Sequence, residues 1–210
     1  HATRSFRGLP YAELSDTDLM SNSDAKGLYA RTTSTTLGAV HAFLSHSWHD
    51  SASAKWQVLA EWADAQPAPP MLWLDKACID QQRINESLAA LPVYLSGCKE
   101  LLVLVGPTYC GRLWCVMEIF TFMRMGGTRE RIEVKMITHK DHTHPAAAKK
   151  ELKKQFATFD AAKAECFLPK DKHRLLAVVE AGFGDFKVFN QHVRSIFDDR
   201  LQETCANLPT

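Results

Sequence analysis

The sequence lacks several features that commonly reveal function. No apolar run approaches the ~18 residues that a membrane-spanning helix needs, and no signal-peptide pattern is present. The formal net charge of +1 gives no electrostatic reason to expect binding to nucleic acid or to an anionic membrane. The dinucleotide fingerprint G-x-G-x-x-G and the P-loop pattern are absent, so any nucleotide must be bound in another way. We therefore expect no nucleic-acid partner and no membrane partner for these residues.

The chain has 6 cysteines, and none of them forms a C-x-x-C pair. They lie mostly in apolar runs, so we expect buried thiols in a reducing, cytoplasmic compartment rather than a disulfide framework. A histidine-rich tract, His139 to His144, could in principle hold a metal ion. Its spacing matches no standard site, so we expect a solvated loop and no metal.

The sequence does contain enough apolar material for a sizeable core, since 46% of its 210 residues are hydrophobic. Apolar runs typical of strands alternate with segments of helical spacing, which indicates a parallel sheet with helices on both faces. We expect an α/β fold with a parallel sheet of about five strands and extra C-terminal helices. The predicted strands are residues 39–45, 71–74, 101–105, 132–137 and 164–168. The predicted helices are residues 85–96, 113–123, 145–157, 172–180 and 185–197, and one that is capped by Ser51 or Ser53 and ends before Gln66.

Residues 1–38 are rich in Ser, Thr, Asp and Gly and show no strong periodicity, so we expect an N-terminal arm that leans on the domain. Residues 39–210 are the predicted α/β domain with an extended C-terminal helical region. The chain begins at His1 without a methionine, so we expect it to be a piece of a longer protein.

Residues 91–123 carry the most informative pattern. The apolar run 101–105 is typical of a strand covered on both faces, and Gly106-Pro107 ends it. Apolar residues then recur at helical spacing, with Glu118 between them. Open α/β folds bind ligands just beyond the C-terminal ends of strands, so Glu118 is a candidate functional acid. The alternative is that Glu118 is an ordinary solvated helix residue.

Three segments, in their order, resemble the TIR (Toll/interleukin-1 receptor-like) domain, a flavodoxin-like α/β fold. The first box of that family is similar to residues 42–50 (AFLSHSWHD), a strand that runs into a polar loop with an acid. Its second strand and long loop resemble residues 72–75 (LWLD) and 76–85. Its third strand and the following helix resemble residues 101–118, where Tyr, Trp-Cys and Glu have the spacing typical of plant-type members.

Many TIR domains cleave nicotinamide from NAD, and the resemblance implies that activity here. The catalytic glutamate of the family lies on the helix after the third strand, and Glu118 is the matching position. Breaking the bond between nicotinamide and ribose builds oxocarbenium character on the sugar, which a carboxylate beside the ribose stabilises. NAD would be the substrate, and no metal or cofactor is needed because the pyridinium leaving group is already activated.

The first-box loop would line the pocket for nicotinamide and ribose. This implies substrate contacts for Ser45, His46, Ser47 and Trp48, with Trp48 stacked on a flat ring. Trp114 is a further candidate, although its position on the apolar side of its helix favours the core.

The phosphate contact departs from the family pattern. The first box of TIR domains often carries an arginine after its serine, and this chain has none there. Lys76 and Arg83, from the long loop, are the candidates to meet the pyrophosphate. Asp75 is either an acid that caps the loop or a contact to ribose or to a metal ion.

Two functions from different classes remain open. The first is an NAD glycohydrolase or cyclase that self-association activates. The second is a non-enzymatic assembly module that binds another domain of its own kind through residues 76–85. A third function, weaker than these, is hydrolysis of the N-glycosidic bond of another nucleotide.

Overall fold

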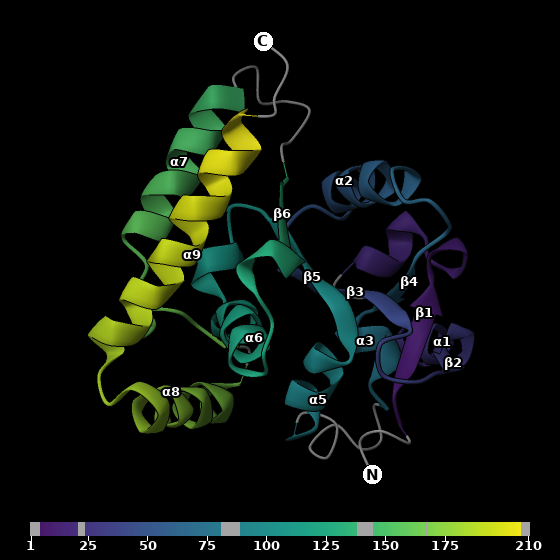
Figure 1. Cartoon of the computed structure of the whole chain (residues 1–210), viewed down its shortest axis with the longest axis horizontal. Coiled ribbons are helices and arrows are strands. Elements are labelled where there is room, and N and C mark those ends of the chain that lie inside the picture. Colours follow the sequence, from purple (N-terminus) through teal and green to yellow (C-terminus); the bar gives the residue numbers. More distant parts are fainter. Residues whose placement is uncertain (1–4, 21–23, 81–88, 138–144, 167, 207–210) are drawn as a thin grey trace.

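The computed structural model describes residues 5–20, 24–80, 89–137, 145–166 and 168–206, and it has an α/β fold (Figure 1). Its sheet has six strands in the order β2-β1-β4-β3-β5-β6. The four strands from β4 to β6 run parallel, whereas β1 pairs antiparallel with both β2 and β4. The strands are β1 (Arg7–Pro10), β2 (Thr33–Ser34), β3 (Val40–His46), β4 (Met71–Trp73), β5 (Cys98–Val105) and β6 (Ile132–Met136).

The order of the parallel strands is that of a flavodoxin-like fold. The chain runs from β3 outward to β4 and then crosses back over β3 to form β5 on its other side. The direction of winding therefore reverses between β3 and β5, and such a switch point is where open α/β sheets bind ligands. The two strands are the longest of the sheet, and residues 101–105 of β5 are fully buried.

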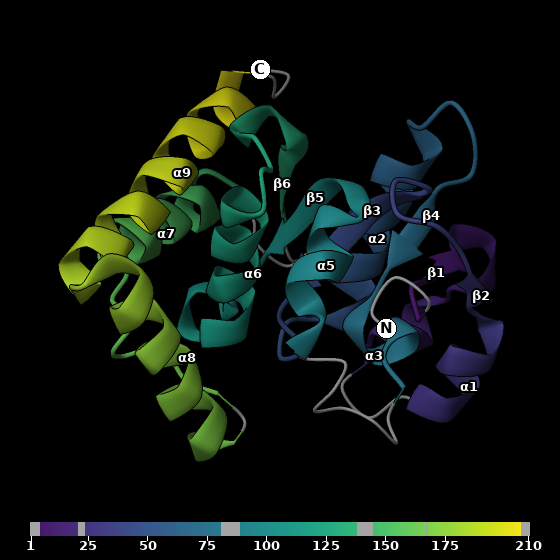
Figure 2. The ribbon, with the colours of Figure 1, turned by 60° about the horizontal axis from the view of Figure 1, so that its bottom comes forward.

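The helices cover both faces of the sheet, as the reversal of winding requires for right-handed crossovers. Helix α2 (Ala52–Asp64) lies on one face, while α5 (Leu91–Ser96) and α6 (Leu113–Arg124) pack together on the other (Figures 1 and 2). Ser51 caps α2 by accepting a hydrogen bond from the backbone nitrogen of Ala54, as one of the two predicted caps. Helix α1 (Ala25–Arg31) packs against α3 (Asp75–Cys78) at the β4 side.

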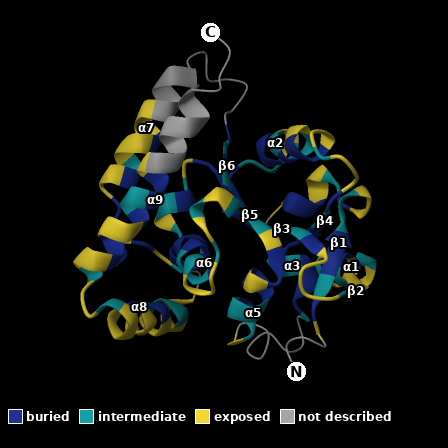
Figure 3. Ribbon diagram, in the orientation of Figure 1, coloured by how far each residue is buried: buried dark blue, intermediate teal, exposed yellow. Residues whose placement is uncertain are grey.

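Three C-terminal helices lie beyond β6 and extend the fold. They are α7 (Pro145–Ala157), α8 (Pro169–Phe183) and α9 (Phe186–Ala206). Their inner sides form an aromatic cluster in which Phe156 stacks on Phe197 and Phe183 packs against Phe189. Figure 3 shows that α8 exposes most of its outer side, and its buried residues are Leu175 and Val179.

The structure corrects the prediction of a fifth strand at residues 164–168. In the described part of this segment, Glu165 makes only an isolated bridge to Arg112. The run is short and ends at Pro169, which begins α8 instead. The fifth and sixth strands are β1 and β2, which lie in the arm of residues 1–38 and which the sequence did not predict. The predicted helix at 85–96 is described from residue 89, and the histidine-rich tract lies outside the described residues.

Candidate functional site

The loops that follow β3 and β5 are joined directly at the switch point. Asp50, in the loop after β3, accepts hydrogen bonds from the backbone nitrogen of Thr108 (3.0 Å) and from its hydroxyl (2.8 Å). The same hydroxyl lies 2.7 Å from Oγ of Ser47. A side chain at Gly106 would collide with the Asp50 carboxylate, so glycine is what allows the close approach of these loops.

Alternation along β3 sends its last two side chains to opposite faces of the sheet. Ser45 faces α6, where its Oγ lies 2.5 Å from Oε2 of Glu118. His46 faces α2, where its Nδ1 lies 3.3 Å from Nζ of Lys55. The first-box residues therefore divide into two groups, one on each side of the end of β3.

Glu118 is buried and belongs to a short chain of hydrogen bonds. Beyond Ser45, the chain continues to the hydroxyl of Tyr109 at 2.7 Å and from there to the backbone carbonyl of Cys115 at 3.1 Å. Burial raises the pKa of Glu118 well above its ordinary value. A hydrogen bond donated by Ser45 to the ionised carboxylate opposes this rise in pKa, and the negative charge of Asp75 adds to it. Glu118 is thus an acid in an apolar setting, unlike a solvated helix residue.

Trp48 is the centre of the second group. Its indole nitrogen donates to the Asp75 carboxylate at 3.2 Å, and the His46 ring packs edge-on against it. The ammonium groups of Lys76 and Lys55 lie 4.8 Å and 5.2 Å from the centroid of its ring, within the range of cation–π attraction. Trp48 is partly exposed, and two ammonium groups lie near its ring.

Lys55 is fully buried and was not among the predicted site residues. Its ammonium donates to the backbone carbonyls of Leu19 (3.0 Å) and Ser47 (3.1 Å). Burial lowers its pKa to about 8, although the charges of Asp50 and Asp75 partly oppose the shift. Lysine in a helix that begins just after a loop is usually solvated, so the sequence gives no signal for this position.

His46 is buried next to Lys55, and both conditions favour its neutral form. Burial, reinforced by the positive charge of Lys55, lowers the pKa of His46 to about 3. Because Lys55 donates to Nδ1, the ring proton lies on Nε2. That buried Nε2 has no hydrogen-bond partner among the described residues.

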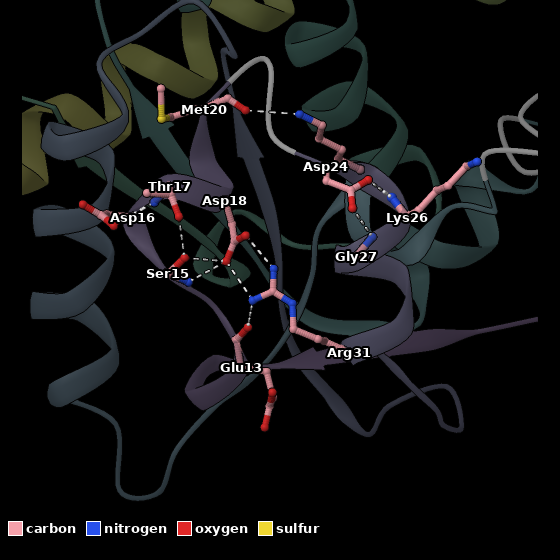
Figure 4. A network of polar contacts seen from close by, with 11 residues as sticks. Glu13, Ser15, Asp16, Thr17, Asp18, Met20, Asp24, Lys26, Gly27 and Arg31 are labelled. Carbon is pink, nitrogen blue, oxygen red and sulfur yellow. Dashed lines mark hydrogen bonds and ion pairs between the residues drawn. The ribbon is translucent and has the colours of Figure 1, made fainter.

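The arm reaches the site through the carbonyls of two consecutive residues. Leu19 accepts from Lys55, and Met20 accepts from Lys76 at 3.1 Å. Figure 4 shows how this segment is held: the two terminal guanidinium nitrogens of Arg31 donate to the Asp18 carboxylate, and the Ser15 hydroxyl donates to the same group. Both lysines beside Trp48 are thus bound to the arm.

The structure brings together most of the predicted site residues, in the two groups described. Ser47 is drawn instead into the contact with Thr108, and Trp114 is half-buried and packs against the core. Arg83 lies outside the described residues. Tyr109, Thr108 and Asp50 join the site without having been predicted in it, although all three lie in the segments that resemble the TIR boxes.

Among the described residues, no group of three or more His, Cys, Asp or Glu side chains is placed to hold a metal ion. No helix in the described part of the chain is long and apolar enough to cross a membrane. Compared with known proteins, the chain matches no protein-family model and no curated protein.

Proposed function

We propose that the chain is an NAD glycohydrolase in which Glu118 is the catalytic residue. The observation that carries the proposal is a buried carboxyl group, held by Ser45, at the switch point between β3 and β5. A perturbed acid at the position where such sheets bind ligands is a physical reason to expect chemistry there. The resemblance to TIR domains supplies the reaction.

The proposed reaction breaks the bond between nicotinamide and C1′ of the ribose. The bonding electron pair leaves with the ring nitrogen, and positive oxocarbenium character develops on the sugar. Water then adds at C1′, and the products are ADP-ribose, nicotinamide and one proton. Glu118 in its carboxylate form stabilises the developing charge, and its low-dielectric surroundings strengthen that stabilisation. Ser45 must release Glu118 before the carboxylate can face a ribose, which agrees with activation by self-association.

The Trp48 group supports recognition of the nicotinamide ring. The pyridinium of NAD is a flat cation, and the Trp48 ring already attracts the ammonium of Lys76. A bound nicotinamide ring would replace that ammonium, which would then be able to meet the pyrophosphate. The Nε2 proton of His46 is a buried donor without a partner among the described residues, which is the kind of group that functional sites retain.

The second candidate function is a non-enzymatic assembly module. One observation favours it: the Glu118 carboxyl is occupied inside the protein by Ser45, as a structural acid would be. In this function the domain would bind a second copy of itself, and Glu118 would serve only to join α6 to β3.

The test is NAD consumption at high protein concentration with a crowding agent, with chromatography of the products. Wild type should release nicotinamide, and Glu118→Gln should abolish the release while keeping the fold, because the amide has nearly the same shape. Glu100→Gln is the matched control, since Glu100 is a partly buried glutamate near the opposite end of β5.

The outcomes separate the two functions. Nicotinamide release by wild type and Glu100→Gln, but not by Glu118→Gln, would support the enzyme. Full turnover in Glu118→Gln would show that Glu118 is not catalytic. No release from any variant, with concentration-dependent self-association intact, would favour the assembly module.

A further inference from the structure

We propose that Tyr109 is a positioning residue that, through Ser45, keeps a proton on Glu118 in the resting protein. The proposal rests on the proposed function for its catalytic meaning, because it describes how the same site is held inactive. Apart from that meaning, the proposal states only which groups carry the protons of the hydrogen bonds that join Glu118, Ser45, Tyr109 and Cys115.

The argument is a count of protons along the hydrogen-bond chain. Three contacts join Glu118 to Ser45, Ser45 to Tyr109, and Tyr109 to the carbonyl of Cys115. Each contact needs one proton, and the hydroxyls of Ser45 and Tyr109 supply two. The Cys115 carbonyl can only accept, so Tyr109 donates to it. Ser45 must then donate to Tyr109, and the proton between Ser45 and Glu118 has to come from Glu118.

An ionised Glu118 would break this chain. Ser45 would donate to the carboxylate, Tyr109 would donate to Ser45, and the bond from Tyr109 to the Cys115 carbonyl would be lost, although that carbonyl lies inside α6 and keeps its helical N–H partner. All of these groups are buried, so a lost hydrogen bond would not be replaced by water. The neutral form of Glu118 is the one that makes all three hydrogen bonds at once.

The surroundings of Glu118 also favour the neutral form. The thiol of Cys115 on α6 and the phenol of Tyr109 before that helix are buried with it, and burial raises the pKa of both well above their ordinary values. The charge that acts on Glu118 from α3 is that of Asp75, which is negative. Neither group next to Glu118 supplies a positive charge that would stabilise its ionised form.

A neutral Glu118 cannot stabilise an oxocarbenium ion by its charge. Separation of Tyr109 from Ser45 would free the Ser45 hydroxyl to donate to Glu118, and the carboxylate would then become the favoured form. The Tyr109 segment thus links the ionisation of the catalytic residue to the conformation of the loop after β5.

The test measures the ionisation of Glu118 by infrared spectroscopy. The absorption band of its protonated carboxyl group is assigned by its loss in Glu118→Gln. In wild type the band should be present at pH 7. Tyr109→Phe should lower the pKa of Glu118 by about one to two units, the worth of one hydrogen bond to a charged group. Tyr94→Phe is the matched control, because this substitution removes a similar hydrogen bond, between Tyr94 and Ser5 (3.0 Å), far from Glu118. The pKa of Glu118 in this variant should equal that in wild type.

A second measurement does not depend on the folding of Tyr109→Phe. If folding raises the pKa of Glu118, the unfolded chain loses its proton near pH 4.3 while the folded chain keeps it. Wild type should therefore lose stability relative to Glu118→Gln as the pH rises above about 4.3. Equal changes in both proteins from pH 4 to 8 would overturn the proposal.

Two further outcomes overturn it: an ionised Glu118 in wild type at pH 7, or an unchanged Glu118 pKa in folded Tyr109→Phe. Failure of the proposed function is distinguishable from these. A protein that cleaves no NAD but keeps the Glu118 proton, and shifts it in Tyr109→Phe, would support the proton assignment and contradict the glycohydrolase.

Discussion

The buried ammonium of Lys55 connects separate segments of the site. Its ammonium joins the arm, through Leu19, to the first-box loop, through Ser47. Burial lowers the pKa of His46, and the charge of Lys55 lowers it further. The lowered pKa of Lys55 means that burial disfavours its charged form even with these acceptors around it. Such a group is costly and is kept where it fixes a particular arrangement, here the position of Trp48 beside the arm.

The pH dependence of stability should reveal Lys55. The unfolded lysine binds a proton below about pH 10.4, whereas the folded one binds it only below about 8. The unfolded state therefore holds more protons between these values, and wild type should gain stability as the pH rises through this window. Relative to Lys55→Met, the gain should reach about 3 kcal/mol when the whole window is crossed.

The measurement is urea unfolding of both proteins from pH 7.5 to 10. Burial raises the pKa of the Cys78 thiol to about 12, which destabilises the folded state at high pH, but this effect is common to both proteins and cancels in the difference. The exposed Lys99→Met serves as a control and should parallel wild type. A constant difference between wild type and Lys55→Met would mean that Lys55 is not buried as a titrating group.

At the scale of the elements, one contact joins the loop after β3 to the loop after β5 and fixes their relative position. It depends on Asp50, Thr108 and the absence of a side chain at Gly106. The carboxylate has little freedom to move aside, because Asp50 is buried and two of its bonds go to Thr108. The two loops that flank the switch point should therefore move as one unit.

Gly106→Ala should destabilise the protein by about 2 kcal/mol or more, since the new methyl group meets a fixed, buried carboxylate. Gly111→Ala is the control, because an added Cβ there has nothing within 4 Å and the backbone is not left-handed. Its stability should stay within about 0.5 kcal/mol of wild type. Urea unfolding measures both, and similar stabilities of the two variants would refute a rigid contact between these loops.

In the whole molecule, the C-terminal helices are packed against the site itself. The ring of Phe197, on α9, is fully buried, stacks on Phe156 of α7, and meets Tyr109 edge-on at 6.2 Å between centroids. The added helices thus support the residue that we propose to hold the Glu118 proton. A structural unit connected in this way should unfold together with the sheet.

Phe197→Ala should cost about 3–5 kcal/mol, because it leaves a cavity between α7, α9 and Tyr109. Thermal unfolding should remain a single transition, shifted to lower temperature. Val178→Ala, at a side chain that is 48% exposed on α8, should change stability by less than about 0.5 kcal/mol. Two separate transitions, with only one of them shifted in Phe197→Ala, would show that the C-terminal helices form an independent unit.

Much of the fold could be predicted from local patterns, because the signal lies in the residues themselves. The long apolar runs of β3 and β5 predict buried strands, and the helical spacing from Leu113 predicts α6. Strands β1 and β2 carry no such signal. They are four and two residues long and belong to the sheet because β4 offers β1 a free edge to pair with.

Only part of the candidate site could be predicted from the sequence. Ser45 and Glu118 were both predicted site residues, because Ser45 lies near the end of β3 and Glu118 lies in the helix that follows β5, but their hydrogen bond was not predicted. The roles of Tyr109 and Lys55 were not predicted either, because each depends on which neighbours bury it. A lysine in a helix and a tyrosine in a loop have the same local sequence signals whether they are buried or solvated.

The sequence by itself determined most of the strands and helices from β3 onward, through the periods of its apolar residues, and the position of an acid in the helix that follows β5. Only the tertiary structure decided that Ser45 contacts Glu118 on one face of the sheet while His46 contacts Lys55 on the other. It also decided that the arm reaches Lys55 and Lys76 and that Glu118 is buried beside Ser45. Hydrogen bonds and charge interactions depend on how close two groups lie and how deeply they are buried. For residues far apart in the chain, only the fold sets these distances and this burial.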